Sequence, residues 1–187
     1  MVGLNVGPFM PPDETGCFVE RCISVDVQGI FLEISPVPGL YFEDFVAGRQ
    51  FTHAVRRTVT EADNVWFSTA TCNPAPIHLD EEYCREHSEF GQRIVNSAFT
   101  LGLLIGLTVG DTTLGTTVGN LGMDEVRFPA PVFHGDTIRA ETEVLDKRDS
   151  RSRPTQGIVT FMHRAYNQRN ELVAQCKRAA LVLRKPA

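Results

Sequence analysis

The sequence predicts an α+β fold in which an antiparallel β-sheet wraps round one long central helix. Residues Ile94–Val109 are apolar on nearly all sides, which is typical of a helix enclosed by the rest of a protein. After Gly115 the chain carries only strand-like segments joined by turn-rich links. With 187 residues, 42% apolar and 22% charged, the chain is long enough to bury such a helix within one globular domain.

The chain is predicted to divide into an N-terminal extension, residues 1–38, and a main domain, residues 39–187. The extension is strand-like in part, because apolar and polar residues alternate within Phe18–Ile34. Pro and Gly residues then introduce a loop over Tyr41–Gly48, and the first strand of the main domain is expected at Phe51–Val59.

A helix should begin after Thr60, because the Thr60 hydroxyl can cap it and Asp63 can reach back to the amide of the cap. Pro74 and Pro76 should end this helix, since proline lacks an amide donor and disfavours helical geometry in the residue before it. The face expected to pack inward carries Ala62, Val65, Trp66, Thr69 and Ala70.

The segment NPAPIHLD follows, and its residues Asn73–Ile77 are predicted to cross between two helices without being helical. Asp80 can cap a second short helix over Glu81–Glu86. His78 is therefore expected in a connection held by prolines on one side and a cap on the other, a rigid support typical of catalytic residues.

The central helix should be capped by Asn96 or Ser97 and should be surrounded by other parts of the structure. Gly102 and Gly106, four residues apart, would let another backbone approach closely. The strands expected after it are Thr117–Phe128, Asp136–Asp146, Gln156–Tyr166 and Glu171–Arg184.

Composition limits the classes of function. The net charge of -5 argues against a general nucleic-acid or membrane-surface binder. The sequence shows neither an apolar run of membrane-spanning length nor a basic segment leading into an apolar one, so we expect a cytoplasmic protein. The five cysteines have no metal-ligand or paired spacing, and His53, His87 and His163 have no partners that suggest a metal; reduced thiols and no metal site are predicted.

The order of these elements, together with NPAPIHLD, resembles the MaoC-like hydratases over about Leu40–Leu183. That family's signature is similar to D-x-N-P-x-H-x-D, and alignment on His78 places Asn73 at the first Asp and Ala75 at the Asn. Pro76 and Asp80 match the pattern. Asn at the first position, with the segments LGMDEVRFPAPVFHGDTI, SRSRPTQGIV and YNQRNELV, resembles the branch that acts on mesaconyl-CoA and itaconyl-CoA.

The resemblance implies a hot-dog fold and a hydratase or dehydratase acting on an enoyl-CoA thioester, here a branched C5 dicarboxylyl-CoA. It also implies a homodimer or a larger homo-oligomer. No separate cofactor is expected, because coenzyme A belongs to the substrate.

Hydration of an enoyl thioester needs a group that takes a proton from water, a proton donor for Cα, and donors for the enolate oxygen. Histidine gains and loses a proton near neutral pH, so His78 is the candidate acid and base. Asn73 in place of Asp cannot take a proton and would orient the water. The helix start at Asn96, Ser97 and Ala98 would stabilise the thioester oxygen.

Arginine and lysine side chains are candidate contacts for the anionic groups of the substrate. Lys147, Arg148, Arg151 and Arg153 form a basic loop that is either a solvated hairpin tip or a contact for the phosphates of coenzyme A. Arg93 and Arg127 are the candidates for a free carboxylate on the acyl group, and the sequence does not choose between them.

Other interpretations stay open. Asn73 can simply turn the chain, Ser97 and Asp80 can be helix caps, and His134 can belong to the turn before a strand. A hot-dog thioesterase would need a carboxylate on the central helix or on a nearby strand, and the helix Ser97–Val109 has none. A non-catalytic acyl-CoA binding module is the third possibility, favoured by Asn73 in place of Asp.

Overall fold

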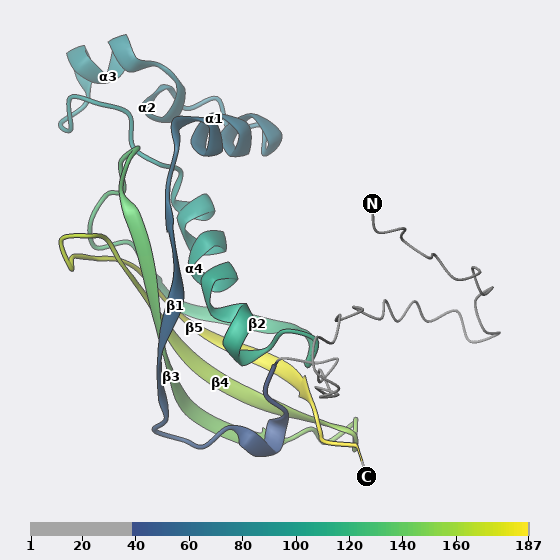
Figure 1. The fold of residues 1–187 in the computed structure, drawn as a ribbon. Helices are drawn as coiled ribbons and strands as arrows, with labels where there is room; N and C mark the ends of the chain where they lie inside the picture. Colours follow the sequence, from purple (N-terminus) through teal and green to yellow (C-terminus); the bar gives the residue numbers. More distant parts are fainter. Residues whose placement is uncertain (1–38, 187) are drawn as a thin grey trace, which may run out of the picture. The chain divides into compact units, whose positions relative to one another are not determined.

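The computed structural model describes residues 39–186 and confirms the α+β class (Figure 1). Five antiparallel strands form one sheet in the order β1-β3-β4-β5-β2. The strands are β1 (Gln50–Thr58), β2 (Thr117–Arg127), β3 (Thr137–Asp149), β4 (Gln156–Tyr166) and β5 (Leu172–Leu183). The helices are the 3-10 turn η1 (Phe42–Asp44), α1 (Glu61–Ala70), α2 (Pro76–Leu79), α3 (Glu81–His87) and α4 (Ser97–Thr112). The predicted strand-like segment Phe18–Ile34, with Cys17 and Cys22, lies outside the described residues.

Every expected strand of the main domain is found, and β3, β4 and β5 show the period-two alternation of a strand with one buried face, whereas β1 and β2 are mostly exposed. In β3 the buried positions are Ile138, Ala140, Thr142 and Val144; the first two pack in one cluster with α4, and Val144 packs in the cluster near η1. Figure 1 shows α4 running along this face of the curved sheet, while α1, α2 and α3 lie together beyond one end of it.

The buried face of the sheet holds two apolar clusters. One packs Leu104 and Leu107 of α4 against the sheet, and the other gathers Phe42, Phe45 and Phe161 near η1. The second cluster leaves no room for a side chain at Gly157, because an added Cβ would lie 2.1 Å from a ring carbon of Phe42.

A buried polar layer joins the end of α4 to the sheet. His53 Nδ1 lies 2.6 Å from Asp111 Oδ1, His53 Nε2 lies 2.8 Å from the Thr142 hydroxyl, and that hydroxyl lies 2.8 Å from His163 Nδ1. Burial, aided by the charge of Arg178 and by His53, lowers the pKa of His163 to about 3. His163 is therefore neutral at physiological pH.

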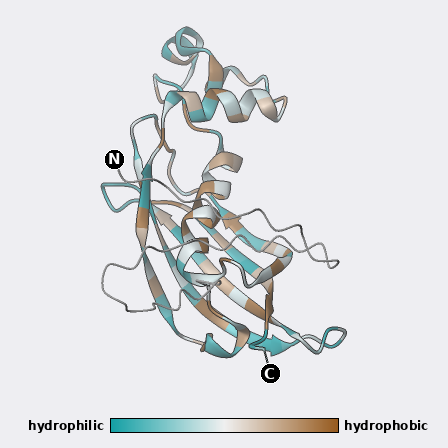
Figure 2. Cartoon of the chain, turned by 45° about the vertical axis from the view of Figure 1, so that its right-hand side comes forward, coloured by the Kyte–Doolittle hydropathy of each residue, from teal (hydrophilic) through white to brown (hydrophobic). Residues whose placement is uncertain are grey.

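The expectation that α4 is surrounded is wrong within the described chain. Thr100, Leu104 and Leu107 are buried against the sheet, but Gly102 and Gly106 are exposed and an added Cβ at either would meet nothing within 4 Å. In Figure 2, α4 is coloured in brown and pale tones along its length. The helix thus leaves one weakly polar side uncovered by residues 39–186. Its start at Ser97 follows Asn96, one of the two predicted caps, and it ends at Thr112, three residues later than predicted.

The predicted inner face of α1 is also wrong. Trp66 is 69% exposed, whereas the buried residues of α1 are the polar Asn64 and Ser68. The limits of the helix match the prediction better: Thr60 and Asp63 form a capping box, and the helix ends before Pro74. Among the described helices, none combines the length and the apolar character that a membrane-spanning segment needs.

Candidate functional site

His78 lies in α2, a short helix between α1 and α3. This corrects the expectation of a non-helical crossing up to Ile77, since Pro76 starts the helix at a position where its missing amide costs no hydrogen bond. Asp80 ends α2 and caps α3 as predicted, because its Oδ1 accepts from the Tyr83 amide at 2.9 Å. His78 is thus held on both sides, and it is only 8% exposed.

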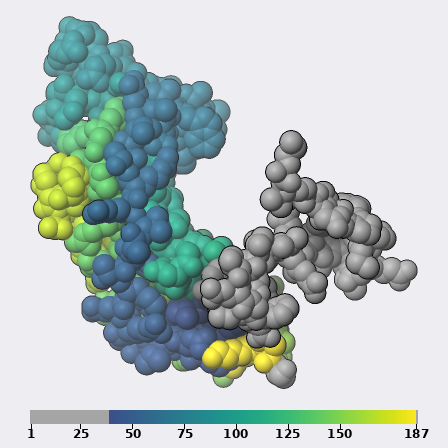
Figure 3. Space-filling view, in the orientation of Figure 1, coloured from purple at the N-terminus to yellow at the C-terminus, as the bar shows by residue number. Residues whose placement is uncertain are grey.

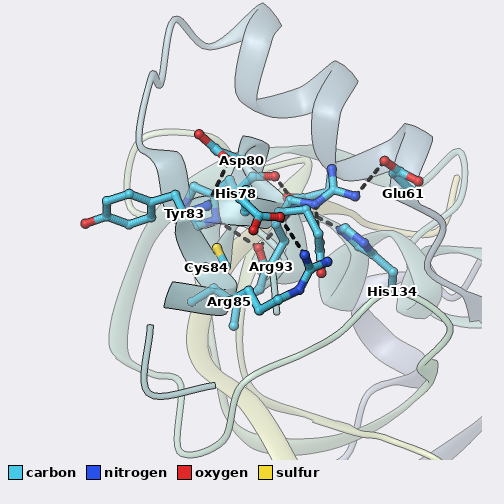
Figure 4. A network of polar contacts seen from close by, with 12 residues as sticks. Glu61, His78, Asp80, Tyr83, Cys84, Arg85, Arg93 and His134 are labelled. Atoms are coloured by element: carbon cyan, nitrogen blue, oxygen red, sulfur yellow. Dashed lines mark hydrogen bonds and ion pairs between the residues drawn. The ribbon is translucent and has the colours of Figure 1, made fainter. Parts of the chain in front are cut away.

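The ring of His78 is fixed through one nitrogen. Its Nδ1 lies 2.9 Å from the carbonyl oxygen of Ile94 (Figure 4). A carbonyl oxygen only accepts hydrogen bonds, so Nδ1 carries the proton. Within residues 39–186 no hydrogen bond is made by Nε2, which in the neutral ring holds a lone pair. His78 is therefore in the tautomer that a base acting through Nε2 requires.

Asn64 of α1, which the sequence analysis did not single out, lies at the centre of the site and is fully buried. Its Nδ2 lies 3.1 Å from the carbonyl oxygens of His78 and Ile94, and its Oδ1 accepts from the Asn96 amide at 2.8 Å. Ser68, one turn later, receives a hydrogen bond from Asn96 Nδ2 at 3.3 Å. Asn64 and Ser68 are polar residues four apart on one face of α1, shortly before NPAPIHLD. This spacing is the feature of the sequence that could have identified them as site residues.

The start of α4 lies beside this network, and the predicted cap is Asn96: its Oδ1 accepts from the Ala98 amide at 3.0 Å. Ser97 and Ala98 are exposed, and Ser97 lines a cleft of about 380 Å³. Ile94, whose carbonyl binds His78, lines the same cleft. The helix start, with its partial positive charge, and the residue whose carbonyl binds His78 thus line one cavity that can hold part of a ligand, although His78 itself is not among the lining residues.

Asn73 is half-buried, and its Oδ1 accepts from the Ala75 amide at 3.1 Å. This contact turns the chain ahead of α2. No hydrogen bond joins Asn73 to His78 among the described residues.

Arg93 is engaged by two acidic side chains. It bonds to Glu81 at 2.8 Å and to Glu61 at 2.6 Å, which ties the start of α3 to the start of α1 (Figure 4). These hydrogen bonds hold the pKa of both glutamates below the ordinary value and raise the pKa of Arg93. The guanidinium therefore has a structural task within the site.

His134 lies on the far side of Asn64, with Nε2 at 3.0 Å from Asn64 Nδ2. The link that carries it precedes β3, as predicted. Burial lowers the pKa of His134, and the charge of Arg93 lowers it further, while Glu61 and Glu81 act in the opposite direction. His134 is thus favoured as a neutral acceptor.

The other predicted arginines lie apart from His78. Arg127 is exposed at the end of β2 and directly precedes Phe128 and Pro129, which line the cleft. Arg151 and Arg153 lie on the exposed turn between β3 and β4. That turn precedes the start of β4, whereas the end of β4 at Tyr166 lies on the side of the sheet nearest α1. The two ends of β4 are about 33 Å apart, because the strand advances about 3.3 Å per residue over ten residues. In Figure 3 the helices α1–α3 lie at the upper end of the molecule.

Comparison with known proteins identifies the family that the motif NPAPIHLD resembles. Residues 44–166 match the MaoC like domain family. The chain is 31% identical over 147 residues to the mesaconyl-CoA hydratase of Cereibacter sphaeroides, covering 79% of this chain and 42% of that protein. It thus spans about two fifths of that relative's length.

Solved structures agree. A MaoC-like dehydratase from Rhodospirillum rubrum is 34% identical, with a TM-score of 0.70 over 80% of this chain and all of that chain. A Mycobacterium tuberculosis protein described as a double hotdog fold is 22% identical, with a TM-score of 0.72 over 80% of this chain and 46% of that one. The fold is therefore the hot-dog fold, and the chain belongs to the MaoC-like domain family.

Proposed function

We propose that this protein adds water to, or removes it from, the double bond of an enoyl-CoA thioester. The observation that carries the proposal is the arrangement of His78, whose Nδ1 is fixed by the carbonyl of Ile94 while Nε2 makes no hydrogen bond among the described residues, and Ile94 lines the same cleft as Ser97 at the start of α4. General acid and base catalysis by a positioned histidine typically contributes ~10²–10⁴-fold to a rate.

In the hydration direction, His78 Nε2 takes one proton from water as the water oxygen bonds to Cβ. The electron pair of the double bond moves toward the thioester, and the Ser97 amide stabilises the enolate oxygen, because the amides of Asn96 and Ala98 already donate to Asn64 and to the cap. A proton then passes from the imidazolium to Cα, which restores the neutral ring. Asn73 would orient the water through its carboxamide, although its Oδ1 also turns the chain.

The substrate we favour is a branched C5 dicarboxylyl-CoA such as mesaconyl-CoA or itaconyl-CoA. Support comes from the hydratase relative, whose name specifies mesaconyl-CoA. Arg127 is the better candidate for the free carboxylate, because the guanidinium of Arg93 already binds two glutamates.

We further propose that two copies associate. Strand β2 is an edge strand, exposed at nearly every position, and carries exposed Leu121, Met123 and Val126. An exposed apolar edge favours pairing with another strand. The relative with a double hotdog fold is about twice the length covered here, so a second copy could supply the missing half.

The test is a panel of linear, methyl-branched and dicarboxylic enoyl-CoA thioesters, incubated with the purified protein. Loss of the conjugated thioester absorbance without release of free thiol is the expected result, fastest for the dicarboxylic compounds. If no compound of the panel is hydrated, and no 3-hydroxyacyl-CoA is dehydrated, the proposal fails.

A thioesterase is the second candidate, because α4 extends beyond the predicted end and includes the carboxylate of Asp111. That carboxylate is bound to His53 and lies about 21 Å along the helix from Ser97, away from the cleft. Release of free thiol in the same panel would favour hydrolysis. Binding with neither reaction would favour an acyl-CoA binding module.

A further inference from the structure

We propose that Asn64 is a positioning residue: its carboxamide fixes the tautomer of His78 and holds His78 at a set distance from the start of α4. This inference rests on the proposed function for its catalytic consequence. Its structural basis is independent of that function, because it follows from contacts among described residues.

The donor side of Asn64 controls His78 at two points. Asn64 Nδ2 lies 3.1 Å from the carbonyl oxygen of His78, which fixes the backbone of α2. It lies equally far from the carbonyl oxygen of Ile94, the group that receives His78 Nδ1. The backbone of the histidine and the acceptor for its ring are therefore held by the same nitrogen.

The acceptor side of Asn64 controls the helix start. Asn64 Oδ1 accepts from the Asn96 amide, and Asn96 caps α4 through the Ala98 amide. One side chain of α1 thus links the candidate base to the helix start that carries the candidate oxyanion donor, the Ser97 amide. A displacement of about 1 Å between such groups can lower a rate by about 100-fold.

The orientation of the carboxamide is set by its neighbours. The Asn96 amide needs an oxygen, and the two carbonyls face N–H groups, so a reversed carboxamide would set its oxygen against both carbonyls and an N–H group against the Asn96 amide. Unpaired buried polar groups are costly, which makes an asparagine at this position hard to replace.

The experiment compares the wild type with Asn64→Asp and Asn64→Ala. Asn64→Asp keeps the oxygen that binds the Asn96 amide and loses the donors to His78 and Ile94, together with the contact to His134. Asn167→Ala is the matched control, because Asn167 is equally buried and bonded but ties the turn between β4 and β5. Long-range proton–nitrogen correlation spectra of the histidine rings report the tautomer of His78 directly, without any substrate.

We expect wild type and Asn167→Ala to show His78 protonated at Nδ1, and both Asn64 variants to lose this preference. With the preferred substrate, the Asn64 variants should lose about 100-fold in kcat with KM nearly unchanged. Thermal unfolding of all variants checks that they fold. If Asn64→Ala does not fold, Asn64→Asp alone decides the outcome.

Two results would overturn the inference: an unchanged His78 tautomer in folded Asn64→Asp, or a loss of kcat no larger than in Asn167→Ala. Failure of the proposed function looks different. In that case the wild type hydrates nothing, while the spectra still report whether Asn64 sets the tautomer.

Discussion

His78 depends on partners far from it in the sequence. The motif NPAPIHLD predicts a supported histidine, and spacing alone assigns the cap Asp80 and leaves Asn96 and Ser97 as the choices for the cap of α4, of which the structure shows Asn96. The contribution of Asn64 and His134 could not be predicted, because their hydrogen bonds join segments 14 to 70 residues apart. Local periodicity carries no information about such pairs.

His134 gives a prediction for pH. Its pKa is lowered in the folded protein from the ordinary value of 6.5, so the folded state binds the proton less well than the unfolded chain. The contribution of neutral His134 to stability is present above pH 6.5 and is lost as the pH falls below it. Protonated Nε2 would also face the N–H groups of Asn64.

His134→Gln removes this titration and keeps an acceptor for Asn64. Urea unfolding at pH 5 and pH 7.5 should therefore show a smaller loss of stability at the lower pH in the variant than in the wild type. Equal losses would mean that His134 does not bind Asn64 as an acceptor.

His163 is buried, and its neutral form contributes to the free energy of unfolding in the same direction as that of His134. Its pKa of about 3 lies far below the ordinary value of 6.5, so the free energy of unfolding should fall as the pH drops through that window. For one group the slope reaches about 1.4 kcal/mol per pH unit. In His163→Gln, denaturant titrations between pH 4.5 and 6.5 should give a slope shallower by up to about that amount. A slope as steep as in the wild type would contradict a neutral buried His163.

Among the elements, the strands follow their pattern closely and α1 does not. Strand β4 has the limits that alternation predicts, because its inward residues are apolar or engaged in the polar layer. In α1 the inward residues are Asn64 and Ser68, which are buried because hydrogen bonds satisfy them. The sequence analysis assumed that the apolar face of α1 packs inward, and it therefore chose the face that is exposed in the structure, including Trp66.

The contact between η1 and β4 is tight enough to test. In Gly157→Ala the new Cβ would overlap the ring of Phe42, and such overpacking typically costs about 1–3 kcal/mol. Gly119→Ala in β2 is the control, because an added Cβ there meets nothing within 4 Å. Denaturant unfolding should show a loss for the first variant only. Equal stability of the two variants would contradict the packing of Phe42 on Gly157.

At the scale of the whole molecule, the uncovered side of α4 is the main difference from the sequence prediction. An apolar helix was expected to be surrounded, and residues 39–186 cover only one side of it. Sequence periodicity reports burial without saying which chain provides the cover. A second copy, as proposed above, would reconcile the pattern with the structure.

This proposal predicts the effect of a larger side chain at Gly106. Gly106→Leu fits the isolated chain, since nothing lies within 4 Å of an added Cβ, but it would obstruct a helix or sheet packed on that side. Light scattering after size-exclusion chromatography should show a dimer for the wild type and a larger monomer fraction for the variant, with Gly106→Ala intermediate. A wild-type protein that is monomeric at all concentrations would contradict association through α4.

The most direct test of the site is the hydration rate of His78→Gln with the best enoyl-CoA of the panel. If Nε2 of His78 transfers the proton, kcat should fall by about 10²–10⁴-fold, while binding of a saturated acyl-CoA analogue stays nearly unchanged. A variant that retains most of the wild-type kcat would contradict the role of His78.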